Sequence, residues 1–190
     1  MRALEERITK DAKILPGNII KVDGFLNHQI DVDFLALLAE EFFRIFANMG
    51  ITKILTVEAS GIALATLTAQ AFKVPLVFAK KAKSDNIEGG LYKSSIYSYT
   101  YKQQVTLIAS QQWLTKGERV LIVDDFLANG EALRGLIEIC TQAGADVAGI
   151  GIAVEKGFQQ GGDKLRQGGA NLHSLAIIDD ISDGTFVFRQ

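Results

Sequence analysis

Short apolar runs that alternate with amphipathic helices constrain the fold of this chain more than any other feature. Lys53–Val57 is such a run, and an alanine-rich helical segment, Ile62–Phe72, follows it after a turn of small residues. The rhythm repeats with Val120–Val123 and a helix expected over Ala132–Ala143, and Val147–Val154 adds another buried strand. Apolar strands separated by helices are typical of a parallel sheet that is covered on both faces. The sequence therefore predicts an α/β fold.

The remaining segments complete a single predicted domain, residues 1–190. The first dozen residues are expected to form a short helix, and a longer helix begins at Asp31 or Asp33 and stops at Gly50. Pro75–Ala79 is expected to form a further strand. Ile177–Phe188 is expected to add one or two strands beside the irregular N-terminal region.

Composition and charge narrow the class of protein. A formal net charge of −2 gives no basic surface for a phosphodiester backbone, so nucleic acid is not an expected partner. No run of about 18 apolar residues is present to span a membrane, and the charged N-terminus does not resemble a secretory signal. The single cysteine, Cys140, lies on the apolar side of a predicted helix and is expected in the core. We expect a cytoplasmic enzyme or binding protein.

Two adjacent carboxylates in the run R-V-L-I-V-D-D-F-L-A-N-G-E-A carry the strongest functional signal. Asp124 and Asp125 are expected where the strand ends, at the edge where parallel α/β sheets bind ligands. Asn129 to Ala132 then offer backbone N–H groups at a helix N-terminus, an arrangement that suits a phosphate, and Gly130 lets the backbone approach closely. One element thus combines an anion cradle with acceptors for sugar hydroxyls. In the alternative, the aspartates only cap the helix, but capping needs one acid rather than two.

The segment Lys80 to Gln104 interrupts the alternation of strands and helices. It is polar, has Gly89-Gly90 at its centre and lacks apolar periodicity. A long excursion of this kind is more often a functional lid or hairpin than a passive connector, so we predict a mobile lid over about 80–104.

Two common nucleotide-binding motifs are absent from the sequence. No P-loop is present, and Gly149-Ile-Gly151 lacks the third glycine of a dinucleotide fingerprint.

Several segments spread along the chain together carry a family resemblance. The run Val120 to Ala132 resembles the signature for phosphoribosyl pyrophosphate (PRPP) of the type I phosphoribosyltransferases. Four further segments resemble other parts of that family: Leu15 to Gly17, Val22 to Gln29, Val57 to Ile62 and Val154 to Phe158. The resemblance implies a parallel twisted sheet flanked by helices, with a small hood built from about 1–30 and 177–190. It also implies a homodimer, and Mg²⁺ that arrives on PRPP rather than in a protein cage.

The resemblance implies roles for the residues on the PRPP side of the site. Asp124 and Asp125 would bind the ribose hydroxyls. Ser60, in the turn Ala59 to Gly61, and Lys81 would contact the pyrophosphate. The 5′-phosphate would be wrapped by five consecutive residues: Ala128, Asn129, Gly130, Glu131 and Ala132. Without the resemblance, Ser60 fits a helix cap equally well and Lys81 would be a solvated surface residue.

By the same resemblance, Ile20, Asn27 and Lys156 would form the pocket for a purine base, with Phe25 stacking on it. The chemistry is consistent, because Lys156 can donate to a 6-oxo group and the Asn27 amide to a 2-oxo group. Without the resemblance, Asn27 would be a turn residue, Lys156 a surface residue and Phe25 part of the core.

The implied activity is transfer of the 5-phosphoribosyl group from PRPP to xanthine, giving XMP and pyrophosphate in purine salvage. Ala128 stands where some 6-oxopurine enzymes carry an aspartate, so adenine is an alternative base and no proton acceptor is assigned. Hypoxanthine or guanine is a further alternative. A PRPP-sensing transcription regulator is a further alternative. It would need a DNA-reading domain or a basic face, and the sequence has neither.

Overall fold

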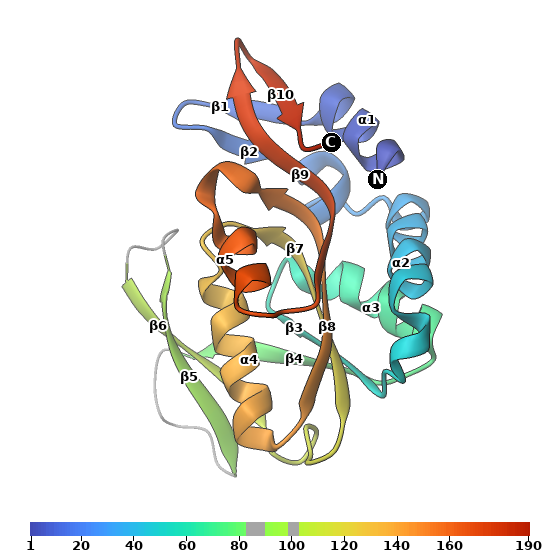
Figure 1. Cartoon of the computed structure of the whole chain (residues 1–190), viewed down its shortest axis with the longest axis vertical. Coiled ribbons are helices and arrows are strands. Elements are labelled where there is room, and N and C mark those ends of the chain that lie inside the picture. Colours follow the sequence, from blue (N-terminus) through green and yellow to red (C-terminus); the bar gives the residue numbers. More distant parts are fainter. Residues whose placement is uncertain (83–89, 99–102) are drawn as a thin grey trace.

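A mostly parallel sheet forms the centre of the molecule in the computed structural model, which describes residues 1–82, 90–98 and 103–190 (Figure 1). Within these residues the main sheet has eight strands in the order β10-β9-β8-β7-β3-β4-β6-β5. The strands are β3 (Lys53–Val57), β4 (Leu76–Ala82), β5 (Leu91–Ser98), β6 (Gln103–Ser110), β7 (Arg119–Leu127), β8 (Asp146–Lys156), β9 (Leu172–Ser182) and β10 (Thr185–Phe188). The inner pairs, from β4 through β3, β7 and β8 to β9, are parallel, as predicted.

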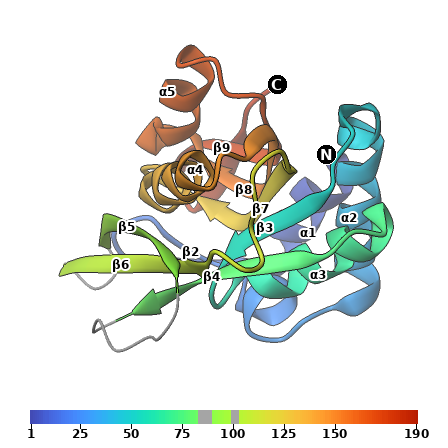
Figure 2. The same ribbon diagram turned by 90° about the horizontal axis from the view of Figure 1, so that it is seen from below.

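Helices cover both faces of this sheet (Figure 2). The α-helices are α1 (Arg2–Asp11), α2 (Val32–Phe46), α3 (Gly61–Phe72), α4 (Glu131–Ala143) and α5 (Gly161–Gln167); shorter helical turns are η1 (Asp23–Asn27), η2 (Ala47–Met49) and η3 (Gly157–Gln159). Among the helices that the structure describes, none combines the length and apolar composition needed to cross a bilayer.

Two hydrophobic cores form, one on each face of the sheet. The first packs α2 and α3 against the sheet around residues such as Phe42 and Leu64, and the second packs α4 around residues such as Leu136. Cys140 belongs to the second core and is fully buried, which confirms its prediction. Burial raises the pKa of its thiol to about 12. Apolar side chains on both sides of the parallel strands explain why those strands are apolar throughout.

Local signals fix the ends of α2 largely as predicted. Of the two candidate caps, Asp31 is the one used, because its side chain accepts a hydrogen bond from the N–H of Phe34 at 3.1 Å. The chain leaves the helix through η2 and then Gly50, whose φ of 63° lies in the left-handed region that glycine tolerates best. The sequence predicted this stop.

Three strands are longer than predicted, and one of these differences changes the site. We expected β7 to end at Val123, before the two acids, but it continues through both of them to Leu127. The reason is tertiary: β8 is also long, and it offers pairing partners for Phe126 and Leu127. Strands β4 and β8 likewise run on, so that Lys81 and Lys156 lie within strands.

The two ends of the chain lie together at one end of the sheet (Figure 1). β1 (Lys13–Leu15) and β2 (Ile19–Lys21) form a separate antiparallel hairpin, and α1 packs against β9 and β10. The α-amino group of Met1 donates to the carbonyl of Leu175, which ties α1 to β9. This agrees with the expected closeness of the two segments, although β9 and β10 belong to the main sheet: β9 pairs with β8 and β10 pairs with β9, and neither pairs with β1 or β2.

The excursion at 80–104 includes β5 and the first residues of β6, which continues to Ser110; the two strands pair antiparallel at the edge of the main sheet. β6 pairs antiparallel with β4, which explains the change from parallel to antiparallel at this edge. Helix α4 packs closely on the hairpin at Gly135, where an added Cβ would lie 2.8 Å from Ile96 Cγ2. The parts of the predicted lid at 83–89 and 99–102 lie outside the described residues.

Candidate active site

The carboxyl ends of β3, β7 and β8 bring the predicted site residues to one edge of the sheet. The three strands are adjacent and parallel, with β7 in the middle. Ser60 follows β3 directly, Asp124 and Asp125 lie near the end of β7, and Lys156 ends β8. Parallel α/β sheets bind their ligands at this edge.

Asp125 is the centre of a small hydrogen-bonded cluster. Its Oδ2 accepts from Asn27 Nδ2 at 2.8 Å, and its Oδ1 accepts from Ser60 Oγ at 2.9 Å. These partners lie 98 and 65 residues away in the sequence. Three residues that were assigned separately to base, ribose and pyrophosphate therefore form one unit. Ser60 occupies the N-cap position of α3, but its side chain makes no capping hydrogen bond and donates to Asp125 instead.

Asp124 is a buried acid beside a second acid. Its side chain is 5% exposed, and its Oδ1 accepts the N–H of Asp125 at 3.0 Å. Burial raises the pKa of Asp124 well above its usual range, and the neighbouring Asp125 raises it further, while Lys81 acts weakly in the opposite direction. Neither aspartate caps α4, whose N-cap is Gly130, so the capping alternative is wrong here.

Gly61 allows α3 to approach the buried acid. A Cβ at this position would lie 2.3 Å from Thr56 Oγ1 and 2.6 Å from Asp124 Oδ1. Both distances are shorter than real Cβ atoms show, so any side chain here would force the Thr56 and Asp124 side chains to shift. The glycine thereby keeps the end of α3 next to the acids.

The predicted phosphate loop leads from β7 into α4. Ala128, Asn129 and Gly130 form the turn, and Glu131 and Ala132 begin the helix. Gly130 has a φ of 87°, and among the described residues no side chain caps the helix. The first N–H groups of an α-helix have no partner within the helix, so they are available for an anion. The Glu131 side chain points elsewhere, since it pairs with Arg134 at 2.9 Å.

Lys81 lies on β4 with its backbone N–H bonded to Glu58 Oε1 at 2.7 Å. Glu58 itself donates its N–H to the carbonyl of Ala79 at 3.0 Å. This ties the turn at Ala59 to Gly61 to the end of β4, and it places an exposed cation near Asp124. The arrangement brings together the two elements that were expected to meet a pyrophosphate.

Lys156 faces the same edge from β8. Its Nζ lies 5.5 Å from the centroid of the Phe126 ring, a distance that allows a cation–π contact. Partial burial lowers the pKa of Lys156. Ile20 is 6% exposed on the small hairpin. Phe126 was not recognised as a site residue from sequence; its position directly after the two acids was the available signal.

Phe25 corrects the expectation of a stacking role. Its side chain is fully buried, with its ring 5.8 Å from that of Phe34 in an edge-to-face contact and the guanidinium of Arg7 4.9 Å from its centroid. No exposed face of the ring is left for a base. The general tendency of phenylalanine to lie in the core therefore accounts for this residue, which supports η1 and so the position of Asn27.

Comparison with known families decides the membership of the chain. The family described as "Phosphoribosyl transferase domain" matches residues 22–164, which include each site residue described above except Ile20. The chain belongs to the phosphoribosyltransferase family. This confirms the fold and the family expected from the sequence, and the two acids on β7 correspond to the segment that carried the resemblance.

Relatives of this phosphoribosyltransferase align along its whole length. It is 52% identical to a xanthine phosphoribosyltransferase of Lachnoclostridium phytofermentans over 100% of this chain and 98% of the relative. It is 51% identical to one of Bifidobacterium adolescentis, with 100% of both chains covered. Among solved structures, the APRTase of Giardia lamblia complexed with 9-deazaadenine aligns with a TM-score of 0.74 and 25% identity over 87% of this chain and 90% of that one.

Proposed function

We propose that this phosphoribosyltransferase transfers the 5-phosphoribosyl group from PRPP to xanthine, releasing pyrophosphate and forming XMP in purine salvage. The observation that carries the proposal is the cluster in which Asp125 accepts from both Asn27 and Ser60. It joins a side chain suited to the base, one suited to the ribose and one suited to the pyrophosphate. The names of the two full-length relatives support xanthine as the base.

For the sugar and its phosphate, the proposal uses the acids and the loop that follows them. Asp124 and Asp125 would accept from the ribose hydroxyls, and the N–H groups from Ala128 to Ala132 would surround the 5′-phosphate. Asn129 and Ala132 bring no hydroxyl groups to the loop, so phosphate binding would depend on the backbone. Ser60 and Lys81 would contact the pyrophosphate.

For the base, two donors match the two carbonyl groups that distinguish xanthine. An amide nitrogen carries two hydrogens, and Asp125 takes one from Asn27, which leaves one for the 2-oxo group. Lys156 would donate to the 6-oxo group. Ile20 would supply an apolar wall, and Phe126 would lie beneath the lysine.

Mg²⁺ would be bound by PRPP and would offset negative charge on the departing pyrophosphate. The residues present fit such an ion, because oxygen atoms are the ligands that Mg²⁺ prefers and two carboxylates, Asp124 and Asp125, are adjacent on β7. Asp124 and Asp125 would face the metal-bound sugar.

Catalysis in this site would consist mainly of positioning and electrostatics. Positive charge would develop on the ribose as the bond to pyrophosphate breaks, and the carboxylate of Asp125 would stabilise it. A base held by Asn27 and Lys156 would approach the anomeric carbon from the other side of the cluster. Burial of both acids keeps water from competing with this interaction.

A base-competition assay tests the proposal. Xanthine, hypoxanthine, guanine and adenine are offered together at fixed PRPP and Mg²⁺, and the nucleotide products are separated and quantified. We expect XMP to dominate. Predominant AMP would move the protein to the adenine-specific class, and absence of any nucleotide product with PRPP would overturn the proposed activity.

We also propose that the enzyme is a homodimer and acts in the cytoplasm, as expected for this family. Light scattering on the purified protein tests the first point, with a mass near twice that of the 20.7 kDa chain as the expected result. A monomer at micromolar concentration would contradict it.

A further inference from the structure

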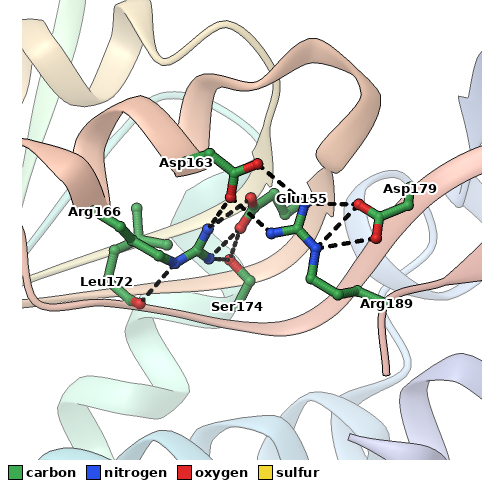
Figure 3. A network of polar contacts seen from close by, with 7 residues as sticks. All are labelled: Glu155, Asp163, Arg166, Leu172, Ser174, Asp179 and Arg189. Carbon is green, nitrogen blue, oxygen red and sulfur yellow. Dashed lines mark hydrogen bonds and ion pairs between the residues drawn. The ribbon is translucent and has the colours of Figure 1, made fainter.

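A network of ion pairs, buried at Glu155 and half-buried elsewhere, includes the residue before Lys156 and has no part in the chemistry described above (Figure 3). We name it the arginine network, and it consists of Glu155, Asp163, Arg166, Ser174, Asp179 and Arg189. We infer that this network positions Lys156 and thereby sets the affinity of the enzyme for its purine base. The inference rests on the proposed base-binding role of Lys156.

The residue before Lys156 is anchored by its side chain. Glu155 is fully buried, and both of its carboxylate oxygens accept from Arg166, at 3.0 Å for Nη1 to Oε1 and 2.5 Å for Nη2 to Oε2. Ser174 also donates to Oε2. A bidentate arginine pair fixes direction as well as distance, so the end of β8 has a defined orientation.

The residue after Lys156 is anchored through its backbone. At Gly157, an added Cβ would lie 2.2 Å from Asp179 Oδ1 and 3.2 Å from Arg189 Nη2. Asp179 is held there by Arg189, whose Nε and Nη2 donate to it at distances from 2.7 to 3.1 Å. The backbone at Gly157 therefore packs directly against the ion pair between Asp179 and Arg189.

Asp163 on α5 joins the two arginines into one unit. It accepts from Arg166 at 3.2 Å and from Arg189 at 2.7 Å and 3.1 Å, and Figure 3 shows it between the two guanidinium groups. The hydrogen bond from Arg189 is the largest cause of the lowered pKa of Asp163. The same helix contacts the phosphate loop, because a Cβ on Gly161 would lie 2.1 Å from the carbonyl of Ala128. Helix α5 thus connects the network, next to the proposed base pocket, with the proposed phosphate loop.

Lys156 itself has few restraints of its own. Within the described residues its ammonium group has no hydrogen bond or ion pair, and its contact is with the Phe126 ring. The position of its Nζ therefore depends on the backbone at Glu155 and Gly157, which the network holds on both sides. Arg189 and Arg166 would be positioning residues, with no direct contact to substrate.

The test compares Arg189→Gln with a matched control, Arg44→Gln, which also removes an arginine fork held by a carboxylate, on the exposed side of α2. We expect Arg189→Gln to raise the KM for xanthine about tenfold, since small displacements of binding groups have effects of this size or larger. The KM for PRPP and the kcat should change much less, and Arg44→Gln should leave all three constants unchanged. Equal changes in both KM values would overturn the inference.

A double-mutant cycle separates this inference from the proposed function. If Arg189 acts through Lys156, Arg189→Gln adds nothing to the KM for xanthine in a Lys156→Ala background. Additive effects would overturn the positioning role while leaving the base pocket intact. An unchanged KM for xanthine in Lys156→Ala alone would instead reject the proposed pocket. Should Arg189→Gln fail to fold, the near-isosteric Asp179→Asn is measured in the same cycle with the same expected results.

Discussion

Two groups of buried acids lie at the same end of the sheet, and they differ in what surrounds them. Asp124 and Asp125 are adjacent on β7, and Lys81, the cation that acts on Asp124, only weakly offsets its burial. Glu155, at the end of the neighbouring β8, accepts two hydrogen bonds from guanidinium N–H groups of Arg166 and one from the hydroxyl of Ser174. The acids on β7 are therefore available to bind a ligand, whereas the charge of Glu155 is compensated within the fold.

The difference has an energetic meaning. A buried carboxylate without a compensating cation destabilises the folded state, whereas one that is fully hydrogen-bonded to arginine becomes costly only when its partner is removed. Removing the charge of Asp124 should therefore stabilise the fold, whereas breaking the pair between Glu155 and Arg166 should destabilise it. A destabilising buried charge of this kind is common in active sites, where activity requires a group that has no partner within the fold.

The largest expected effect lies in the arginine network. Arg166→Gln leaves Glu155 buried with a neutral partner that cannot make the bidentate pair, so we expect the free energy of unfolding to fall by about 3–5 kcal/mol. Urea unfolding followed by circular dichroism measures it. The double variant Glu155→Gln with Arg166→Gln removes both charges and should recover part of the loss; no recovery would show that packing rather than charge dominates.

The next effect concerns activity at the other group. Asp125→Asn keeps the size of the side chain but removes the charge that would stabilise the ribose, so we expect kcat to fall about 100-fold with little change in the unfolding midpoint. Steady-state rates with saturating PRPP and xanthine measure it. Activity near that of the parent enzyme would remove Asp125 from the proposed mechanism.

At Asp124 we expect a smaller change in the free energy of unfolding, and a gain rather than the loss expected for Arg166→Gln. Its pKa is raised in the folded protein, so the native state favours the protonated form and loses stability as the pH rises through that raised value. Asp124→Asn should raise the free energy of unfolding by about 1–3 kcal/mol at neutral to alkaline pH. Unfolding at pH 8 and pH 5 checks the sign: the gain should shrink at the lower pH, and a larger gain there would contradict the assignment.

The smallest effect is expected at the phosphate loop. Gly130 has a φ of 87°, so Gly130→Ala should cost about 1 kcal/mol of stability from backbone strain. Because the same turn presents N–H groups to the proposed phosphate, the KM for PRPP should rise more than the KM for xanthine. Differential scanning fluorimetry and initial rates at varied PRPP measure the two results, and an unchanged KM for PRPP would argue against the loop as the phosphate site.

Local patterns predicted most of the fold. The strand at Lys53–Val57 was placed with the bounds that the structure has, and α2 and α4 were placed within a residue or two, because apolar periodicity and capping signals act over a few neighbouring residues. The end of β7 was misplaced. Its extension to Leu127 depends on pairing with β8, which no local signal near Asp124 could reveal.

The sequence by itself determined the alternation of strands and helices, the placement of two acids before a glycine-containing turn, and the family of the chain. Only the tertiary structure decided which side chains meet. Asn27 and Ser60 reach Asp125 across 98 and 65 residues, Phe25 is enclosed in the core, and Arg189 returns from the last strand to support the backbone at Gly157. The physical reason is that capping and periodicity act locally, whereas hydrogen bonds and ion pairs between distant segments form only once the sheet sets the register of its strands.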